Sequence, residues 1–313
     1  MIISQVSKEW INRTRAGYKV ALALFAVYVV WGSTYLAIRI VVATVPPLFA
    51  AGVRFTIAGA ILYLWCRMRG APRPPRMQWR NLSMLGALMF LATYSGLFWA
   101  EKTLPSGIAA VLVATLPIWM ALLSIFVLKR EKMRWQLLAA ICLGFTGVIV
   151  LALGSGLGHG NVLACLAVLG SEIGWAVGSV TSKRMTLPKS KLMSAGGQML
   201  TGGVMLLAFS ALAGELRTAP HISLRAALGI GYLIVAGSII AFTAYVWLLG
   251  QMPATTVSSY AYVNPVVALL IGHWLGQEAL GLRTVLGAGL VLASVLLILN
   301  GKPSAGNNAP ERA

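Results

Sequence analysis

The chain has 313 residues, of which 58% are hydrophobic and only 10% are charged, and its mean hydropathy is +0.82. Soluble domains carry roughly 25% charged residues, so this composition excludes a water-soluble globular protein and indicates one that lies in lipid. The net charge of +18 does not point to a nucleic-acid partner. The basic residues lie in short loops between apolar runs, where they set membrane topology and contact anionic lipid headgroups.

Apolar runs of about 20 residues, the length that a transmembrane helix needs, follow one another along the chain. We predict ten spans, at residues 19–39, 47–66, 81–100, 105–128, 135–153, 161–182, 192–213, 226–249, 253–276 and 282–299. The longest connection, 67–80, is a basic, proline-rich linker, and no segment is large enough for a soluble catalytic unit. The sequence therefore predicts an all-α membrane protein with ten transmembrane helices.

The distribution of Lys and Arg predicts the orientation of these helices. If the N-terminus is cytoplasmic, the cytoplasmic segments carry 19 basic residues and the opposite side carries 5, while Arg54 lies inside a span. Because cytoplasmic loops are enriched in Lys and Arg, we expect both termini, residues 1–18 and 300–313, to be cytoplasmic.

The two halves of the chain can be aligned with each other. At an offset of 144 residues the matched pairs are Trp31 with Trp175, Arg39 with Lys183, Arg54 with Gln198 and Gly59 with Gly203. Farther along the offset is 148, with the pairs Trp99 and Trp247, Pro105 and Pro253, and Pro117 and Pro265; Glu131 and Glu278 differ by 147. Each half, 19–153 and 161–299, holds five spans, so the second half must enter the membrane upside down. Inverted repeats of this kind are typical of secondary transporters, whose substrate site lies near the midplane between the halves.

Four segments carry a family resemblance: VVWGSTYLAIRIV, AAGVRFTIAGAIL, LPSGIAAVLVATLPIWMALLS and MPATTVSSYAYVNPVVALLIG. They resemble the EamA repeats of the drug/metabolite transporter superfamily, and the likeness covers residues 20–300 as two repeats. The resemblance implies ten helices, alternating access and, commonly, export of amino acids or other metabolites across a bacterial inner membrane. It also implies a cavity lined by helices one, three, four, six, eight and nine.

The predicted sixth helix has two distinct faces at 100° per residue. One face carries Gly170, Gly174 and Gly178, a spacing that lets helices approach closely in lipid. The opposite face and the repeat-related face of helix one carry aromatic and polar residues, which we predict to line a substrate site: Glu172, Trp175 and Ser179, with Tyr28, Trp31 and Tyr35.

Glu172 is the only carboxylate well inside a predicted span. An ionisable group within the membrane is expensive and is by default a functional hypothesis. It could bind a substrate amine or carry a coupling proton; alternatively, it forms a structural ion pair with Arg54, whose predicted depth differs by only about 6 Å.

Helices four and nine each contain a proline near mid-span, Pro117 and Pro265. Proline removes a backbone hydrogen bond, so we predict a hinge or kink at each position. Further candidates for the cavity wall are Tyr94, Trp99, Tyr245, Tyr260 and Asn264. For Trp99, bracing of a hairpin together with Trp247 is the alternative.

Enzyme signatures are missing from the sequence: it contains no Asp, no HExxH motif and no P-loop. We expect no catalytic residues, no cofactor and no metal, and we expect a small-molecule substrate and membrane lipid as the partners. Two halves in one chain remove the need for a dimer, so the protein could act as a monomer. The prediction is a secondary active transporter that exports small metabolites such as amino acids. A lipid or multidrug translocator on the same fold, and a channel, remain the alternatives.

Overall fold

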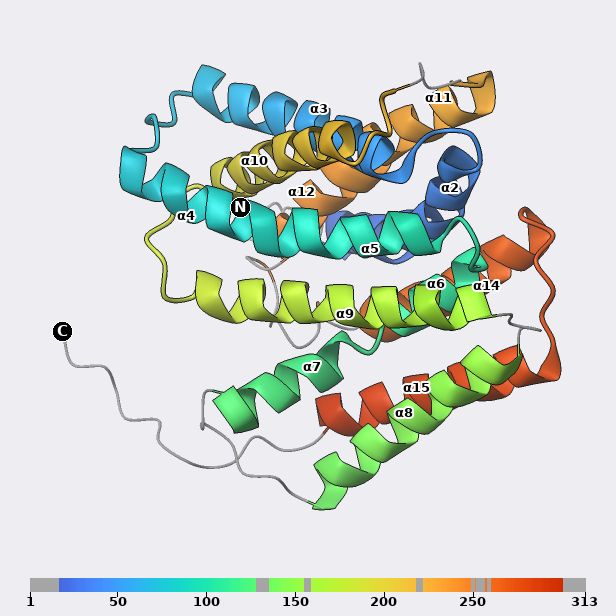
Figure 1. Ribbon diagram of the computed structural model, residues 1–313. Helices are drawn as coiled ribbons and strands as arrows, with labels where there is room; N and C mark the ends of the chain where they lie inside the picture. Colours follow the sequence, from blue (N-terminus) through green and yellow to red (C-terminus); the bar gives the residue numbers. More distant parts are fainter. Residues whose placement is uncertain are drawn as a thin grey trace, which may run out of the picture.

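The computed structural model describes residues 17–127, 135–154, 159–217, 222–248, 251, 257 and 260–300, and every regular element within these ranges is helical (Figure 1). The predicted terminal segments, residues 1–18 and 300–313, lie almost entirely outside the described residues. The described helices run side by side across the view of Figure 1, so that most connections lie at its two sides.

Seven helices are long and apolar enough to cross a membrane, and they confirm seven of the ten predicted spans. They are Gly17–Val42, Pro47–Met68, Arg76–Ala100, Ser106–Val127, Val162–Ser182, Lys191–Leu212 and Leu224–Leu248. Their main elements are α2 (Trp31–Val42), α3 (Pro47–Met68), α4 (Arg76–Gly86), α5 (Thr93–Ala100), α6 (Ser106–Val113), α7 (Leu116–Leu122), α9 (His159–Ser182), α10 (Lys191–Leu212), α11 (Leu224–Tyr232) and α12 (Ala241–Leu248). The chain is therefore a multi-pass membrane protein.

The other three predicted spans correspond to helices whose described apolar parts are shorter. These helices are α8 (Trp135–Gly154), α14 (Tyr260–Trp274) and α15 (Leu282–Asn300). The apolar stretches of α8 and α15 are Trp135–Leu151 and Leu282–Ile298, and part of the predicted span 253–276 lies outside the described residues. These three stay predicted spans.

Four π-helical stretches directly adjoin α-helices. They are Ala26–Val30, Ala87–Ala92, Leu123–Val127 and Leu233–Ile240. Two of them join shorter helices into one span, α4 to α5 and α11 to α12. Such insertions change the direction of the side chains that follow without ending the helix.

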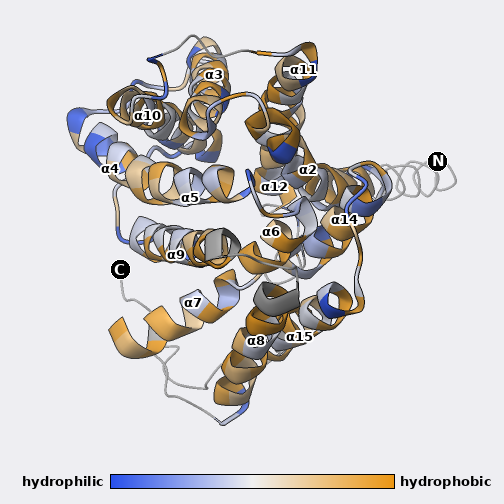
Figure 2. Ribbon diagram, turned by 45° about the vertical axis from the view of Figure 1, so that its right-hand side comes forward, coloured by the Kyte–Doolittle hydropathy of each residue, from blue (hydrophilic) through white to orange (hydrophobic). Residues whose placement is uncertain are grey.

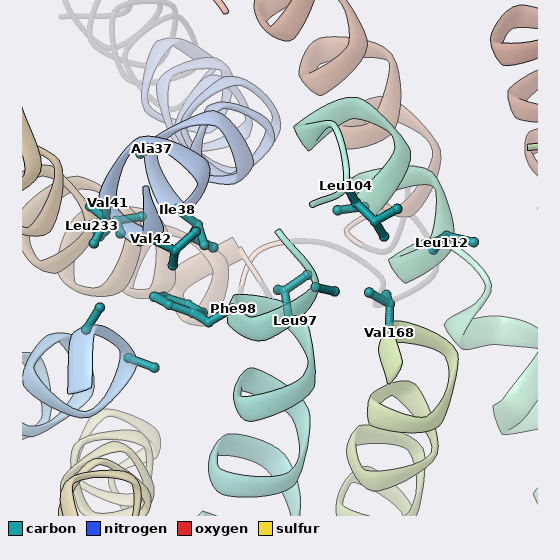
Figure 3. Close-up of a cluster of buried hydrophobic side chains, with 14 of the residues drawn as sticks. Ala37, Ile38, Val41, Val42, Leu97, Phe98, Leu104, Leu112, Val168 and Leu233 are labelled. Atoms are coloured by element: carbon teal, nitrogen blue, oxygen red, sulfur yellow. The ribbon is translucent and has the colours of Figure 1, made fainter. Parts of the chain in front are cut away.

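The surface and the interior are both apolar, as lipid requires. Large hydrophobic side chains such as Leu64, Phe126 and Leu212 are exposed along the helices, and Figure 2 shows mostly hydrophobic ribbon, with hydrophilic segments such as the start of α4 at helix ends. In the buried core, Phe98 of α5 is turned toward Ile38 of α2, and Leu97 toward Val168 of α9 (Figure 3).

Glycines set the closest contact between helices, that of α3 with α10. A Cβ added at Gly59 would lie 2.3 Å from the Leu200 amide nitrogen, and one at Gly203 would lie 2.4 Å from that of Thr56. These two glycines are the pair that the sequence aligns at an offset of 144. Small residues here bring the two backbones together, which is how helices associate where lipid offers no hydrophobic gain.

The glycine face predicted on the sixth helix, now α9, is confirmed at two of its three positions. A Cβ at Gly174 would lie 2.8 Å from the Leu88 carbonyl oxygen, and one at Gly178 would lie 2.4 Å from the Met89 side chain. Nothing lies within 4 Å of the corresponding position at Gly170, so for this residue the prediction is wrong.

Candidate functional site

Glu172 lies on α9, with a residue exposure of 2%. Its carboxylate is within electrostatic range of the hydroxyls of Tyr35 on α2, Tyr94 on α5 and Tyr260 on α14. No hydrogen bond or ion pair joins it to another described residue. Four helices therefore contribute one carboxylate and three phenols to this part of the bundle, a set of groups that can accept a cation, an amine or a proton.

The backbone next to Glu172 fixes this arrangement. The Thr93 hydroxyl at the start of α5 donates to the Ser171 carbonyl (3.1 Å), and the Ser171 hydroxyl turns back to the carbonyls of Ala167 and Val168 (2.8 and 2.9 Å). Because a Cβ at Gly96 would lie 2.8 Å from the Ala167 carbonyl oxygen, α5 and α9 are in direct backbone contact here.

An aromatic cluster surrounds Trp31, at the start of α2. The ring centroids of Tyr245, Tyr260 and Phe242 lie 5.4, 5.3 and 6.4 Å from that of Trp31. The indole N–H donates to the Gly237 carbonyl (2.8 Å), which fixes the orientation of the ring. Tyr28, one turn earlier, packs with Trp31, Tyr245 and Tyr260 against one group of buried apolar side chains, which are Ala23, Val27, Leu248 and Val257. The structure thus brings together four of the predicted site residues, which are Tyr28, Trp31, Tyr245 and Tyr260.

A second aromatic cluster surrounds Tyr94. Its ring centroid lies 4.3 Å from that of Phe55, 5.9 Å from that of Phe90 and 6.3 Å from that of Trp175. Trp175 and Tyr94 are the counterparts of Trp31 and Phe242 at offsets of 144 and 148, and the two ring separations, 6.3 and 6.4 Å, are nearly equal.

Arg54 is buried but does not pair with Glu172. Its Nε donates to the Ser238 hydroxyl (3.0 Å), and its guanidinium lies 4.7 Å from the ring centroid of Phe55 and 5.6 Å from that of Tyr94. The Nη1 atom has no hydrogen-bond partner among the described residues. The ion-pair alternative for Glu172 is therefore not formed in this structure.

Three other predicted site residues lie outside this group of side chains. Asn264 is buried, and in the side-chain orientation that satisfies both its amide atoms it donates to the carbonyls of Val27 and Tyr28 (3.2 and 3.1 Å). It therefore ties α14 to the π-helical stretch of the first helix. Trp99 is 42% exposed and takes part in no ring contact among the described residues, and its place in the site stays a prediction. Ser179 is half-buried, about two turns beyond Glu172 on α9.

The two predicted prolines lie in different backbone environments. The fourth predicted helix ends at Val113 and restarts as α7 at Leu116, with Pro117 in the first turn of the new helix. The α-helix is therefore interrupted just before Pro117, and the hinge stays a prediction. Pro265 instead lies inside α14, which continues on both sides of it.

An ion pair that the sequence reasoning missed joins segments at one end of the bundle. Glu278 Oε1 lies 2.5 Å from Arg39 Nη1 and accepts a hydrogen bond from the Ser106 amide (2.8 Å), while Oε2 accepts one from the Gly107 amide (3.2 Å). We call this group, Glu278 with Arg39 and the first two amides of α6, the Glu278 clasp. The repeat singles out Glu278, but nothing in the sequence says which helix it would reach.

Two further glutamates lie at the same end of the bundle. Glu215 accepts hydrogen bonds from the amides of Leu48 and Phe49 at the start of α3 (3.3 and 3.0 Å) and from the Ser210 hydroxyl (2.8 Å). Carboxylates are favourable at helix N-termini, so glutamates from the second half cap two helices of the first half. Glu101, directly after α5, is 1% exposed.

The described residues offer no metal centre. Among them, no group of three or more His, Cys, Asp or Glu side chains could hold a metal ion. The three cysteines, Cys66, Cys142 and Cys165, are free thiols.

The sequence matches the EamA-like transporter family in two stretches, residues 18–153 and 162–300. It is 42% identical over 283 residues to the inner membrane transporter YedA of Escherichia coli strain K12, a protein described as uncharacterized, and the alignment covers 90% of each chain. It is 29% identical over 280 residues to protein PecM of Dickeya dadantii, covering 88% of this chain and 91% of PecM.

A similarity of fold extends to a solved crystal structure. The TM-score is 0.62 with 22% sequence identity, and the match covers 89% of this chain and 96% of the other. At this identity the likeness concerns the fold alone.

Proposed function

The chain belongs to the EamA-like transporter family, and from this premise we propose that this membrane transporter is a secondary active exporter of small metabolites such as amino acids. It works by alternating access around a site in the middle of the bundle. The observation that carries the proposal is the environment of Glu172, a buried carboxylate without an ion-pair partner among the described residues and with three tyrosine hydroxyls within range.

Glu172 has one of two roles in this proposal. An ammonium group of the substrate supplies the cation that the carboxylate lacks, or a proton neutralises it and is exchanged for substrate. Both roles follow from the same physical fact, that a buried carboxylate is stable only when it is paired or neutral. The aromatic rings of Trp31 and Trp175 then form the apolar walls, and cation–π contact with a substrate amine adds to recognition.

The proposed architecture is ten helices in two inverted repeats of five, with both termini in the cytoplasm. Two separate family matches support the repeat, as do the glycines at the α3–α10 contact, Gly52 and Gly59 with Gly196 and Gly203, all at an offset of 144. The excess of Lys and Arg on one side supports the orientation. In this orientation the Glu278 clasp faces the outside of the cell, and the interruption between α6 and α7 is a hinge for rocking of the halves.

The test is uptake of a panel of radiolabelled amino acids into proteoliposomes of the purified protein, with and without a pH gradient. We expect saturable uptake of one class that is lost in Glu172→Gln and weakened in Trp31→Ala. Loss of the gradient dependence in Glu172→Gln would assign the proton role, and loss of substrate binding at all pH values would assign the amine role.

The matched control is Tyr63→Phe, which removes a hydroxyl from a tyrosine outside the site, packed against Trp79 (5.4 Å between centroids). The corresponding Tyr35→Phe, Tyr94→Phe and Tyr260→Phe variants should each lower uptake. Full activity of both Glu172→Gln and Trp31→Ala would refute the site. Uptake of hydrophobic amines or lipids, with no uptake of any amino acid, would replace the metabolite exporter with the multidrug or lipid translocator.

A further inference from the structure

Glu101 is a buried acid with no role in the proposed substrate site. It lies directly after α5, outside the apolar span that ends at Ala100. Its residue exposure is 1%, and neither carboxylate oxygen accepts a hydrogen bond of normal geometry from a described residue, although the Arg39 backbone lies close enough to lower the pKa of the carboxyl. An unpaired ionised carboxylate in such a place carries a large desolvation cost. A proton or a nearby cation must therefore neutralise the carboxylate.

The charged and polar neighbours of Glu101 determine whether its carboxyl group can be ionised. Among the charged neighbours, the Glu278 carboxylate has the largest effect on the pKa of Glu101, followed by the guanidinium groups of Arg39 and Arg54. The Tyr35 hydroxyl is also within electrostatic range of Glu101. Arg39 is already engaged by Glu278, and Arg54 is held by Ser238. Glu101 thus faces the Glu278 carboxylate and two arginines that are each bound to another side chain, so its ionisation is opposed while the Glu278 clasp is intact.

The clasp closes this end of the bundle. The Glu278 carboxylate reaches Arg39 at the end of α2 and the first amides of α6, while its backbone carbonyl is 2.8 Å from His273 Nδ1 on α14. A Cβ at Gly272 would lie 2.6 Å from Glu278 Oε2, so the carboxylate rests directly on α14. Separation of α2 and α6 from α14 at this end therefore requires that the clasp break.

We propose that Glu101 is a proton-binding site that controls this end of the transporter: protonated Glu101 keeps the Glu278 clasp closed, and loss of the proton opens it. An ionised Glu101 repels Glu278 and competes with it for Arg39, whereas a neutral carboxylic acid does neither. The inference rests on the proposed alternating access, because it requires that this end opens. It holds for any substrate at the Glu172 site.

The direction of the pH dependence follows from linkage. In the closed state, burial and the Glu278 carboxylate raise the pKa of Glu101 well above its usual value, and Arg39 and Arg54 offset this only in part. In an open, hydrated end the pKa returns toward the usual value of about 4. The closed state therefore binds the proton more tightly, and its population is largest at low pH and falls as the pH rises toward the closed-state pKa.

The experiment measures opening directly, without substrate. Spin labels at Thr44→Cys, after α2, and Ala279→Cys, after Glu278, lie at exposed positions on two sides of the clasp. They are introduced into a full chain in which Cys66, Cys142 and Cys165 are replaced. Electron–electron distance measurements in lipid nanodiscs are then made from about pH 5 to about pH 9, a range that a raised carboxyl pKa enters.

We expect one short distance at low pH and a growing longer-distance population as the pH rises. Glu101→Gln, which mimics the protonated acid, should hold the short distance at every pH, and Glu278→Gln should show the longer distance at every pH. Glu215→Gln is the matched control, because this glutamate caps α3 without a neighbouring carboxylate among the residues around it. It should keep the wild-type pH dependence.

Two outcomes would overturn the proposal. One is a pH dependence of Glu101→Gln equal to that of the wild type. The other is a distance distribution that responds to Na⁺ at constant pH and not to pH itself, which would indicate a metal cation in place of the proton. A second measurement needs no labels: in the Glu172→Gln background, the infrared C=O band of a protonated carboxylic acid should be present at neutral pH and absent after Glu101→Gln. If no substrate is ever transported but the distances follow pH as expected, the proposed function fails and this inference stands.

Discussion

Glu172 in the middle of the bundle and Glu278 at one end are both buried glutamates of the second half of the chain, yet they have opposite surroundings. Glu278 has an arginine and two backbone amides within hydrogen-bond distance. Glu172 has no hydrogen bond or ion pair with a described residue, and only aromatic hydroxyls are within electrostatic range.

This difference separates a carboxylate that holds helices together from one that is free to bind a ligand or a proton. A buried acid that is fully partnered within the protein holds helices together and has no free capacity for a ligand. A buried acid that lacks partners costs stability, and a membrane protein that keeps it needs it for binding or coupling. The two glutamates should therefore respond to the same chemical change in opposite ways.

The largest effect is expected on transport by Glu172→Gln. If the carboxylate pairs with a substrate amine, its loss costs roughly 2–5 kcal/mol of binding, which is about 30-fold or more in affinity. The free energy of unfolding should stay the same or rise, because a desolvated charge is removed without breaking an ion pair. Transport and unfolding are measured on the same preparation. A loss of stability as large as that of Glu278→Gln would contradict the distinction between the two sites.

Glu278→Gln, unlike Glu172→Gln, should lower the stability of the protein. It removes the ion pair with Arg39 and weakens the two hydrogen bonds from α6, so we expect the free energy of unfolding to fall by about 2 kcal/mol. Denaturant unfolding in mixed micelles measures it. Glu215→Gln loses a helix cap without an ion pair and should cost only about 1 kcal/mol. Equal losses for the two variants would mean that Arg39 contributes nothing.

The sequence predicts the middle of the bundle better than its end. The tryptophans at 31 and 175 and the glutamate at 172 stand out because helical periodicity and the internal repeat place them on particular faces, and the structure gathers most of them. Contacts such as Glu278 with α6 depend on how a turn between two helices folds back over a distant segment, and no local pattern encodes that. Glu101 was missed for the same reason: next to Lys102 at the end of an apolar run, it resembles an ordinary loop residue.

Gly59→Ala tests whether the middle of the bundle is as tightly constrained as the clasp. The added Cβ would lie 2.3 Å from the Leu200 amide nitrogen, a backbone atom that cannot move aside alone. We expect a loss of roughly 1–3 kcal/mol in the free energy of unfolding. Gly170→Ala, where nothing lies within 4 Å, is the control and should change stability by no more than about 0.5 kcal/mol. Similar effects of both substitutions would contradict the close packing of α3 on α10.

The smallest effect concerns the turn that presents Glu278 to its partners. Gln277 has a φ of 53°, the only positive value among the described non-glycine residues. This conformation costs a residue other than glycine roughly 1 kcal/mol or more. Gln277→Gly should therefore raise the free energy of unfolding by about 0.5–1 kcal/mol, whereas Ala279→Gly, at a residue without a positive φ, should lower it. If Gln277→Gly also leaves transport unchanged, the strain is a cost of holding the Glu278 clasp and has no part in the chemistry at Glu172. A loss of stability in Gln277→Gly would instead mean that the glutamine side chain itself supports the turn, and that the end of the bundle depends on more than its ion pair.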